Sequence, residues 1–147
     1  MSYKPYTLHI NEDNTRYEFQ SIGKRGIFEK VIIISLLDNP CNWALLDYDP
    51  VTDEYTDLSV TDNGDMKEIL STVMHAIKLF LTVRPGKLIQ FTGSSQSRTR
   101  LYQIAINKVY LDLENDFEIY GWLNEEWVPF EPNLSFESFL IGKSIIT

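Results

Sequence analysis

The chain contains very little of the chemistry that marks metal and redox sites. It has one cysteine, Cys41, and two histidines, His9 and His75, in 147 residues. A single cysteine cannot form an internal disulfide, which is typical of proteins in a reducing cytoplasm. Three dispersed residues cannot supply the ligand set of a structural zinc site. We therefore expect a cytoplasmic protein without a bound metal or cofactor.

Long hydrophobic runs are also absent. The longest, such as 31–34 and 79–81, are far too short to cross a bilayer. The first ten residues contain no apolar segment followed by a small-residue cleavage site. We therefore expect neither a membrane span nor a secretory signal.

Several catalytic and nucleotide motifs are missing. The segment 93–98 lacks the second glycine, the lysine and the following Ser or Thr of a P-loop, and no GxSxG elbow is present. An acidic segment lacks the central glycine and closing glutamate of a calcium loop, which favours a solvated turn; its acids are Asp47, Asp49, Asp53 and Glu54. Hydrolytic chemistry and calcium binding therefore have no support in the sequence.

Acidic residues are absent from one long segment. The formal net charge is −8, which argues against broad binding to nucleic acid or anionic membrane. Residues 69–111, however, contain six of the 13 basic residues and none of the 21 acidic ones. The segment either supplies a buried helix and strand, where acids are scarce, or it presents positive charge to an anion.

What is present is the profile of a folded domain. Hydrophobic residues make up 44% of the chain and aromatic residues 13%, enough for a full core. Alternating and β-branched segments predict four antiparallel strands, at 16–22, 27–37, 43–48 and 55–60. The segment Gly23–Gly26 between the first two is interpreted as a hairpin turn, with a backbone cradle for phosphate as the alternative.

Two helices are predicted in the second half. The first has Asp65 as its side-chain cap, Glu68 completing a capping box, an apolar stripe from Met66 to Leu81, and Pro85 at its end. A short, central strand at 87–92 separates it from a second helix at about 97–113, whose inner face carries Leu101, Ile104, Ala105 and Val109. A wider apolar arc predicts that this helix is contacted on two sides; its further members are Tyr102, Ile106, Tyr110 and Leu113. A hairpin follows at 117–130, and the tail 136–146 fits either a short helix or an edge strand.

This order predicts an α+β fold in a single domain, 1–147. An antiparallel strand meander is followed by α-β-α-β-β, and we expect both helices to pack on one mixed sheet.

The turn between the strand at 87–92 and the second helix is the candidate binding site. A glycine permits a sharp turn, serines can cap the helix or donate hydroxyl hydrogen bonds, and free amides at a helix N-terminus attract anions. Arginine adds fork-shaped donors for phosphate or carboxylate. The predicted ligand-binding residues are Gly93, Ser94, Ser95, Ser97, Arg98, Arg100 and Tyr102.

Two alternatives stay open for these features. Arg98 and Arg100 lie about 200° apart around a helix, so one of them can instead pair with an internal acidic loop while the serines only cap. The aromatic residues Trp122, Trp127 and Phe130 near the last hairpin either close the edge of the core or form a stacking surface.

The second half of the chain resembles a family of small bacterial proteins of unknown function. Their pattern has Asn-Gly-Asp before the first helix, here Asn63 to Asp65. It continues with a strand leading into Gly-Ser, here Gly93 and Ser94, and then Arg-Thr-Arg-Leu-Tyr, here 98–102. The resemblance extends to the glycine hairpin and covers most of the chain, and it implies no known activity.

A weaker similarity of topology concerns the GCN5-related acyltransferases. The order helix, strand, helix, strand resembles their core, and it implies a coenzyme A site before the first helix. The matching segment, 60–68, has Asp62 and Asp65 where the pyrophosphate would lie, and carboxylates repel that group.

The sequence therefore leads to one main hypothesis and two alternatives. The first is a non-enzymatic module that holds a nucleotide, a nucleic-acid phosphate or an acidic partner at the Gly93–Tyr102 turn. The others are an acyltransferase-like enzyme that uses coenzyme A and a structural protein–protein interaction domain.

Overall fold

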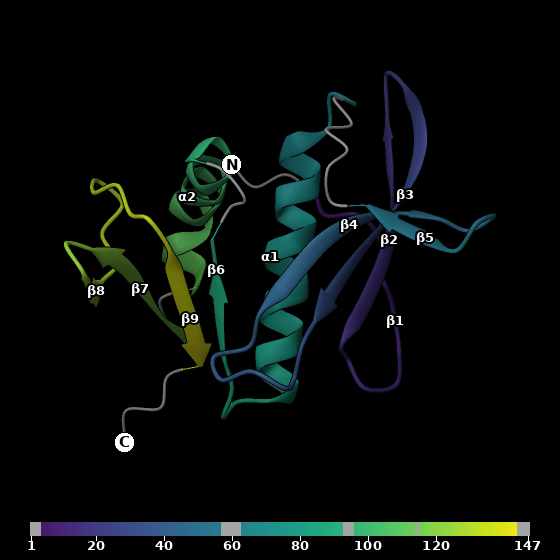
Figure 1. Ribbon diagram of the computed structural model, residues 1–147. Coiled ribbons are helices and arrows are strands. Elements are labelled where there is room, and N and C mark those ends of the chain that lie inside the picture. The colour runs from purple at the N-terminus through teal and green to yellow at the C-terminus, as the bar shows by residue number, and fades with distance from the viewer. Residues whose placement is uncertain (1–3, 57–62, 93–95, 114, 144–147) are drawn as a thin grey trace.

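The computed structural model describes residues 4–56, 63–92, 96–113 and 115–143. Two helices and two antiparallel sheets make up this part of the chain (Figure 1), so the predicted α+β class is confirmed.

The first sheet is a five-stranded meander in the order β1-β2-β3-β4-β5. Each strand pairs with the next in the sequence, as expected for the first half of the chain. The strands are β1 (His9–Ile10), β2 (Arg16–Gly23), β3 (Gly26–Ile34), β4 (Trp43–Asp49) and β5 (Glu54–Thr56). Only β1 was not expected, because two exposed residues are too short to give an alternating pattern.

The second sheet has the order β6-β9-β7-β8. Its strands are β6 (Leu88–Phe91), β7 (Phe117–Leu123), β8 (Glu126–Pro129) and β9 (Phe139–Lys143). The ambiguous tail therefore forms a strand, and it lies between β6 and β7 rather than at an edge. In the hairpin between β7 and β8, Asn124 and Glu125 both have positive φ, which matches the twist of the two strands.

The expected single mixed sheet is wrong, because both sheets are antiparallel and β6 does not join the first one. The strand β9 pairs with one edge of β6, and β6 is the edge strand of the second sheet. The prediction that β6 is a central strand is therefore wrong. On its other edge β6 pairs, within the described residues, with Cys41, whose N–H donates to the Leu88 carbonyl at 2.7 Å and whose carbonyl accepts from Gln90 N–H at 3.1 Å. Pro40 precedes Cys41 and has no N–H to extend this ladder.

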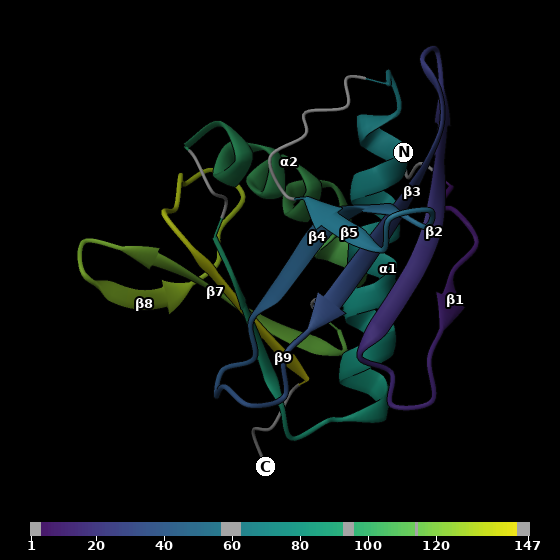
Figure 2. The same cartoon turned by 45° about the vertical axis from the view of Figure 1, so that its right-hand side comes forward.

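Helix α1 (Met66–Val83) lies between the two sheets (Figure 1). Its predicted stripe is buried from Ile69 to Leu81, but Met66 is 42% exposed. Burial also includes Thr72, Met74 and Ala76, which lie outside the stripe. The buried arc is wide because the first sheet crosses one side of the helix (Figure 2) while α2 contacts another.

Helix α2 (Gln96–Leu113) covers the inner face of the second sheet. The prediction was right about Ala105, which is buried, and wrong about Ile104, which is 41% exposed. Ile106, from the wider apolar arc, is fully buried. The contacts of α2 with α1 and, through Tyr110, with Phe130 agree with the prediction of neighbours on two sides.

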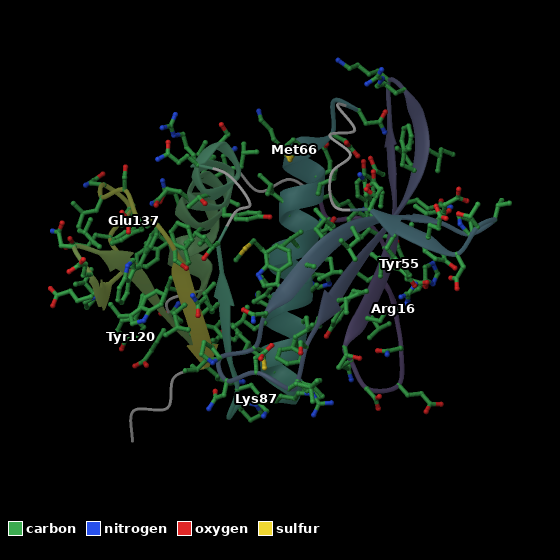
Figure 3. All side chains as sticks on the ribbon, in the orientation of Figure 1. Arg16, Tyr55, Met66, Lys87, Tyr120 and Glu137 are labelled. Atoms are coloured by element: carbon green, nitrogen blue, oxygen red, sulfur yellow. The ribbon has the colours of Figure 1, made fainter. Side chains whose placement is uncertain are left out.

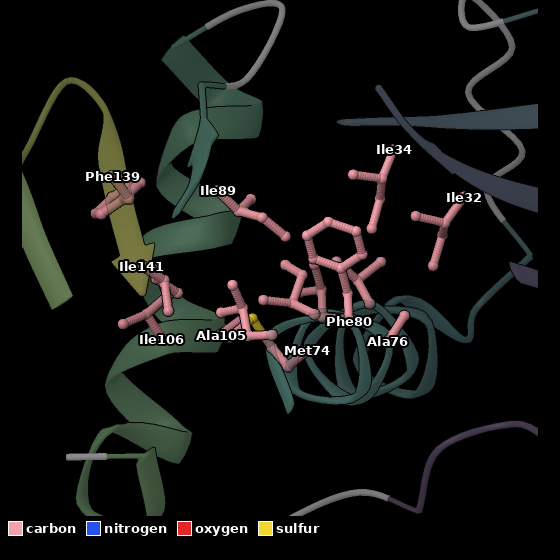
Figure 4. Packing of buried hydrophobic residues seen from close by; sticks show 14 of the residues in the cluster. Ile32, Ile34, Met74, Ala76, Phe80, Ile89, Ala105, Ile106, Phe139 and Ile141 are labelled. Atoms are coloured by element: carbon pink, nitrogen blue, oxygen red, sulfur yellow. The ribbon is translucent and has the colours of Figure 1, made fainter. Parts of the chain in front are cut away.

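One hydrophobic cluster joins both sheets and both helices. Figure 4 shows Ile32 and Ile34 of β3 on the side of α1 that carries Phe80, while Ala105 of α2 lies beside Met74. The two sheets therefore share one core with both helices.

The start of α1 differs from the expected capping box. Asp65 is the N-cap residue, but its side chain makes no hydrogen bond to the helix. Its Oδ2 accepts instead from the Tyr6 hydroxyl at 2.7 Å and from the Ser21 hydroxyl at 2.5 Å. The tertiary partners, brought by the N-terminal segment and β2, have replaced the local cap.

Two tyrosines should make the stability of the fold decrease with pH in the alkaline range. Burial, together with the hydrogen bond to Asp65, raises the pKa of Tyr6 to about 12, and burial raises the pKa of Tyr17 to about 12. The folded state therefore keeps protons that the unfolded chain loses near its ordinary pKa of 10.0. We expect the free energy of unfolding to be unaffected by these groups below pH 10 and to fall between pH 10 and 12. Urea unfolding at several pH values measures this, and Tyr6→Phe should make the decline shallower.

Candidate functional site

The predicted site lies partly outside the described residues. Gly93, Ser94 and Ser95 fall there, and so does the side chain of Arg98, whose backbone lies in the first turn of α2. Of the described residues, Ser97 and Arg100 are exposed on the first turns of α2, and Tyr102 is half-buried. The predicted site residues that the structure describes therefore do not all lie on one surface: two are exposed and one is partly in the core.

Arg100 lines a cavity of about 470 Å³ at the N-terminal end of α2, which we call the α2 pocket. One wall comes from α2 and the preceding strand end, and the other from the connection between β8 and β9, where Glu137 is labelled in Figure 3. The lining residues are Thr92, Gln96, Thr99, Arg100, Gln103, Ser135, Phe136 and Glu137. The α2 members are three and four positions apart, so they share one face of the helix.

The floor of the α2 pocket is held by hydrogen bonds across the two walls. Gln103 is 9% exposed, and its Oε1 accepts from Phe136 N–H at 3.2 Å while its amide donates to Asn107 Oδ1 at 3.2 Å. The hydroxyls of Thr92 and Ser138 lie 2.5 Å apart. The pocket therefore has a defined polar floor rather than a loose surface hollow.

The ring of Phe136 gives the pocket a rigid apolar wall. It packs against Phe130 with ring centroids 5.4 Å apart and against Phe139 at 6.2 Å. A Cβ on Gly121 would lie 2.2 Å from this ring, so the absence of a side chain there lets Phe136 reach its place. The fixed ring means that the shape of the pocket does not depend on Phe136 changing rotamer.

Among the described residues that line the α2 pocket, the charged ones are Arg100 and Glu137. Within the described part of the chain Arg100 forms no ion pair, and the first turn of α2 has no acid. The alternative in which an internal acidic loop neutralises Arg100 therefore finds no support in these residues. A guanidinium, the positive end of a helix, and neutral hydroxyl and amide groups together favour a bound anion. Glu137 adds an acceptor for a ligand N–H or O–H.

Tyr102 does not face this pocket. Its ring packs against Trp43 of β4 with centroids 5.5 Å apart and an interplanar angle of 58°. It therefore belongs to the contact between α2 and the first sheet. Arg100 and Tyr102 therefore lie on different faces of α2.

The glycine hairpin is confirmed as a hairpin, with Gly23 paired to Gly26, and its amides are not free for phosphate. Lys24 N–H donates to the Asn63 carbonyl at 3.1 Å, and Arg25 N–H donates to Asn63 Oδ1 at 2.7 Å. The Asn63 amide donates to Ser21 Oγ at 3.1 Å and to the Gly26 carbonyl at 3.0 Å. This set of bonds, here called the Asn63 latch, uses the donors that a phosphate cradle would need.

The segment matched to a coenzyme A loop is also used internally. Asn63 is 1% exposed and Asp65 is 4% exposed, and both bond to other parts of the protein. Asp62 lies outside the described residues. The described part of this segment therefore presents no open site for a pyrophosphate.

The remaining candidates have structural surroundings. Cys41 is fully buried, and burial raises its thiol pKa, which disfavours the reactive thiolate. His9 and His75 are both exposed. Among the described residues no group of three or more His, Cys, Asp or Glu side chains is arranged to hold a metal ion.

Phe130 is buried in the core, whereas Trp122 and Trp127 pair at its edge with ring centroids 5.2 Å apart.

Sequence analysis missed half of the α2 pocket. The spacing of Gln96, Thr99 and Gln103 with Arg100 is a signal that was present, because four polar residues at helical spacing mark a polar face. Ser135 to Glu137 carried no such signal, since only the pairing of β9 beside β6 brings that connection to α2.

Comparisons with known proteins identify the family and nothing finer. The family model described as "Family of unknown function (DUF6934)" matches residues 2–144. No curated protein and no solved structure matches the chain. The helices in the described ranges include none with the length and hydrophobicity needed to span a membrane.

Proposed function

The chain belongs to this family of unknown function, DUF6934, and we propose that it is a non-enzymatic module that binds a small anionic molecule in the α2 pocket. The observation that carries the proposal is the position of Arg100, a guanidinium that lines a cavity without an ion pair in the described part of the chain. An arginine in that setting retains its donors for an incoming phosphate or carboxylate.

The size and polarity of the pocket narrow the ligand. A volume of about 470 Å³ lies within the range of small-molecule sites and matches a nucleotide-sized ligand better than a protein surface. Neutral groups from Gln96, Thr99 and Ser135 suit a polar ligand, and Glu137 favours one that also carries hydrogen-bond donors. An adenine or guanine nucleotide has this combination of an anionic group and N–H donors.

A nucleic acid or a large acidic partner is less well supported. The net charge of −8 repels a polyanion at long range, and the pocket offers one described cation rather than a basic stripe. A localised anion that enters beside Arg100 and the α2 N-terminus avoids most of that repulsion. We therefore propose a mononucleotide or a similar small anion rather than a strand of nucleic acid.

Removing the guanidinium should abolish most of the binding while leaving the fold intact. We expect Arg100→Gln to weaken the binding of adenosine or guanosine monophosphate at least tenfold, since a charge-assisted hydrogen bond contributes roughly 1.5–3 kcal/mol. Because Arg100 is exposed and has no described ion pair, the melting temperature should stay within about 1 °C of the parent. Isothermal titration calorimetry and thermal unfolding measure the two effects.

The matched control is Arg25→Gln, which removes the same charge from the exposed hairpin. Its backbone N–H, which bonds to Asn63, is kept. Nucleotide affinity should change by no more than about twofold in this variant. The proposal is wrong if both variants bind equally, if neither nucleotide nor inorganic phosphate binds the parent, or if Arg100→Gln lowers stability without affecting a ligand.

A further inference from the structure

An irregularity in the second sheet places Glu137 in the wall of the α2 pocket. Glu137 and Ser138 share one partner in β7, because Glu137 N–H donates to the Trp122 carbonyl at 3.0 Å and Trp122 N–H donates to the Ser138 carbonyl at 2.9 Å. Two residues opposite one make a β-bulge, which breaks the alternation of a strand. Phe136 and Phe139, three positions apart, are accordingly both buried. Bulges often redirect a side chain beside a functional site, and this one adjoins a cavity.

Glu137 and Arg100 line the same cavity of about 470 Å³ without neutralising each other. Within the described part of the chain neither side chain forms an ion pair. Arg100 belongs to α2 and Glu137 to the opposite wall, so the pocket is positive on one side and negative on the other. Two unlike charges that stay apart in one cavity are complementary to a ligand with an anionic group at one end and hydrogen-bond donors at the other.

The wall that carries Glu137 is held in place from two directions. Phe136 N–H donates to Gln103 Oε1 of α2 at 3.2 Å, and the bulge ties residue 137 to β7. One N–H of the Gln103 amide donates to Asn107 Oδ1, and the second has no partner among the described residues, which leaves a donor at the nearly buried floor. Because the backbone on both walls is already ordered, binding a ligand between them costs little conformational entropy.

Guanine is the base whose edge fits a carboxylate best. Its N1–H and its N2 amino group are adjacent donors, and the two oxygens of one carboxylate can accept from both. Adenine and cytosine each place an amino group beside a ring-nitrogen acceptor, which a carboxylate oxygen repels. Uracil has one N–H between two carbonyl oxygens. Among these four bases, guanine alone gives a carboxylate two favourable hydrogen bonds and no repulsive contact.

We propose that Glu137 makes the α2 pocket selective for a guanine nucleotide, an inference that rests on the nucleotide binding proposed above. The phosphate lies at Arg100 and the N-terminal end of α2, and the Glu137 carboxylate accepts from guanine N1–H and from the N2 amino group. The Glu137 side chain is exposed and has no hydrogen bond to another described side chain, so its oxygens need not leave an internal partner to meet the base.

Three nucleotides that differ only at the base edge test the selectivity. Guanosine monophosphate has both donors, inosine monophosphate lacks the N2 amino group, and adenosine monophosphate has an acceptor at N1. Isothermal titration calorimetry should show the guanosine nucleotide binding at least tenfold more tightly than the adenosine nucleotide, with the inosine nucleotide between them, because each donor lost removes a charge-assisted hydrogen bond. Equal affinities for the three would overturn the selectivity.

Glu137→Gln should shift the preference toward adenine. A glutamine amide accepts from the adenine N6 amino group and donates to N1, but it offers guanine one acceptor instead of two. We expect the affinity for guanosine monophosphate to fall at least tenfold and that for adenosine monophosphate to rise roughly threefold. Equal gains for both nucleotides would show that Glu137 only repels the phosphate, which contradicts base recognition.

The matched control is Glu131→Gln, an exposed position of the same connection that does not line the pocket. Its backbone carbonyl, which accepts from Leu134 N–H, is kept. Both affinities should change by less than about twofold in this variant, and thermal unfolding should show that both variants are folded. A change of preference in Glu131→Gln equal to that in Glu137→Gln would mean that only net charge matters and would contradict the role of Glu137.

The failure of the selectivity differs from the failure of the binding function. If the parent binds none of the three nucleotides and no inorganic phosphate, the binding function is wrong and the selectivity with it. If all three bind equally and Arg100→Gln weakens each of them, the binding function stands and the role of Glu137 is wrong. The same holds if guanosine monophosphate is preferred but Glu137→Gln keeps that preference, because the base is then recognised by other groups.

Discussion

Replacing Gly23 with alanine is expected to destabilise the protein by about 3 kcal/mol, the upper range for forcing an extra carbon into a packed site. A Cβ built on Gly23 lies 1.9 Å from the carbonyl oxygen of Asn63 and 2.9 Å from its Cγ. The obstacle is backbone, so it cannot be relieved by a rotamer change. The hairpin must move away from Asn63, which lengthens the hydrogen bond from Lys24 N–H to that carbonyl. The melting temperature should fall by roughly 10 °C, as measured by calorimetry or circular dichroism.

Gly86→Ala provides the matched control. Nothing lies within 4 Å of a Cβ at Gly86, which lies in the turn after α1 and has no positive φ. Alanine there should leave stability unchanged or raise it by up to about 1 kcal/mol, because it restricts the unfolded chain. Similar melting temperatures for the two variants would show that the close approach of Gly23 to Asn63 does not exist in solution.

Asn63→Ala is expected to produce the second large loss, also about 3 kcal/mol. The side chain is buried and makes three hydrogen bonds, to Arg25 N–H, Ser21 Oγ and the Gly26 carbonyl. Alanine leaves these groups without their partner in a site that excludes water, and each orphaned group costs roughly 1–3 kcal/mol before the structure relaxes. Urea unfolding gives the free energy, and hydrogen exchange should show faster exchange of Arg25 N–H.

The control for this variant is Asn115→Ala, at an exposed position before β7. It makes the same chemical change without burial, and its effect should stay within about 0.5 kcal/mol. A loss at Asn63 no greater than that at Asn115 would mean that the Asn63 latch contributes nothing to stability.

These two variants give a physical role to a motif that the sequence alone could not interpret. Asn63, Gly64 and Asp65 resembled a family pattern and suggested helix capping or a ligand loop. In the structure Asn63 holds the β2–β3 hairpin, and Asp65 bonds to Tyr6 and Ser21. Gly64 has a φ of +78°, which few other residues adopt, so it lets the chain turn between these two contacts. The described motif residues are part of the framework rather than the α2 pocket.

Local patterns predicted the elements well where each had one neighbour. The strand β2 alternates because one face packs in the core and the other does not, and β3 follows it after a two-residue turn. Helix α1 was bounded correctly by Asp65 and Pro85. The failures occurred where two neighbours compete for one element. Ile104 was assigned to the core because α2 is apolar on several sides, and periodicity does not rank them.

The sequence placed the candidate site at the N-terminal end of α2, where Arg100 lines the α2 pocket, but it did not indicate the residues of the opposite wall. Arg100 and the α2 N-terminus follow from local rules about charge and helix dipoles. Glu137 and Phe136, which complete the pocket, lie more than 30 residues away along the chain and carry no signal that links them to α2.

The sequence by itself determined the class of fold, the antiparallel meander, the two helices and the concentration of positive charge before residue 112, because these depend on residues close together in the chain. The tertiary structure decided that there are two sheets, that β9 lies inside the second one, and that Tyr102 and Arg100 face different neighbours. Such outcomes depend on which distant strands compete for the same hydrogen-bonding edge and which side chains fill the same volume. A local sequence pattern contains no information about which distant strands pair or which distant side chains pack together.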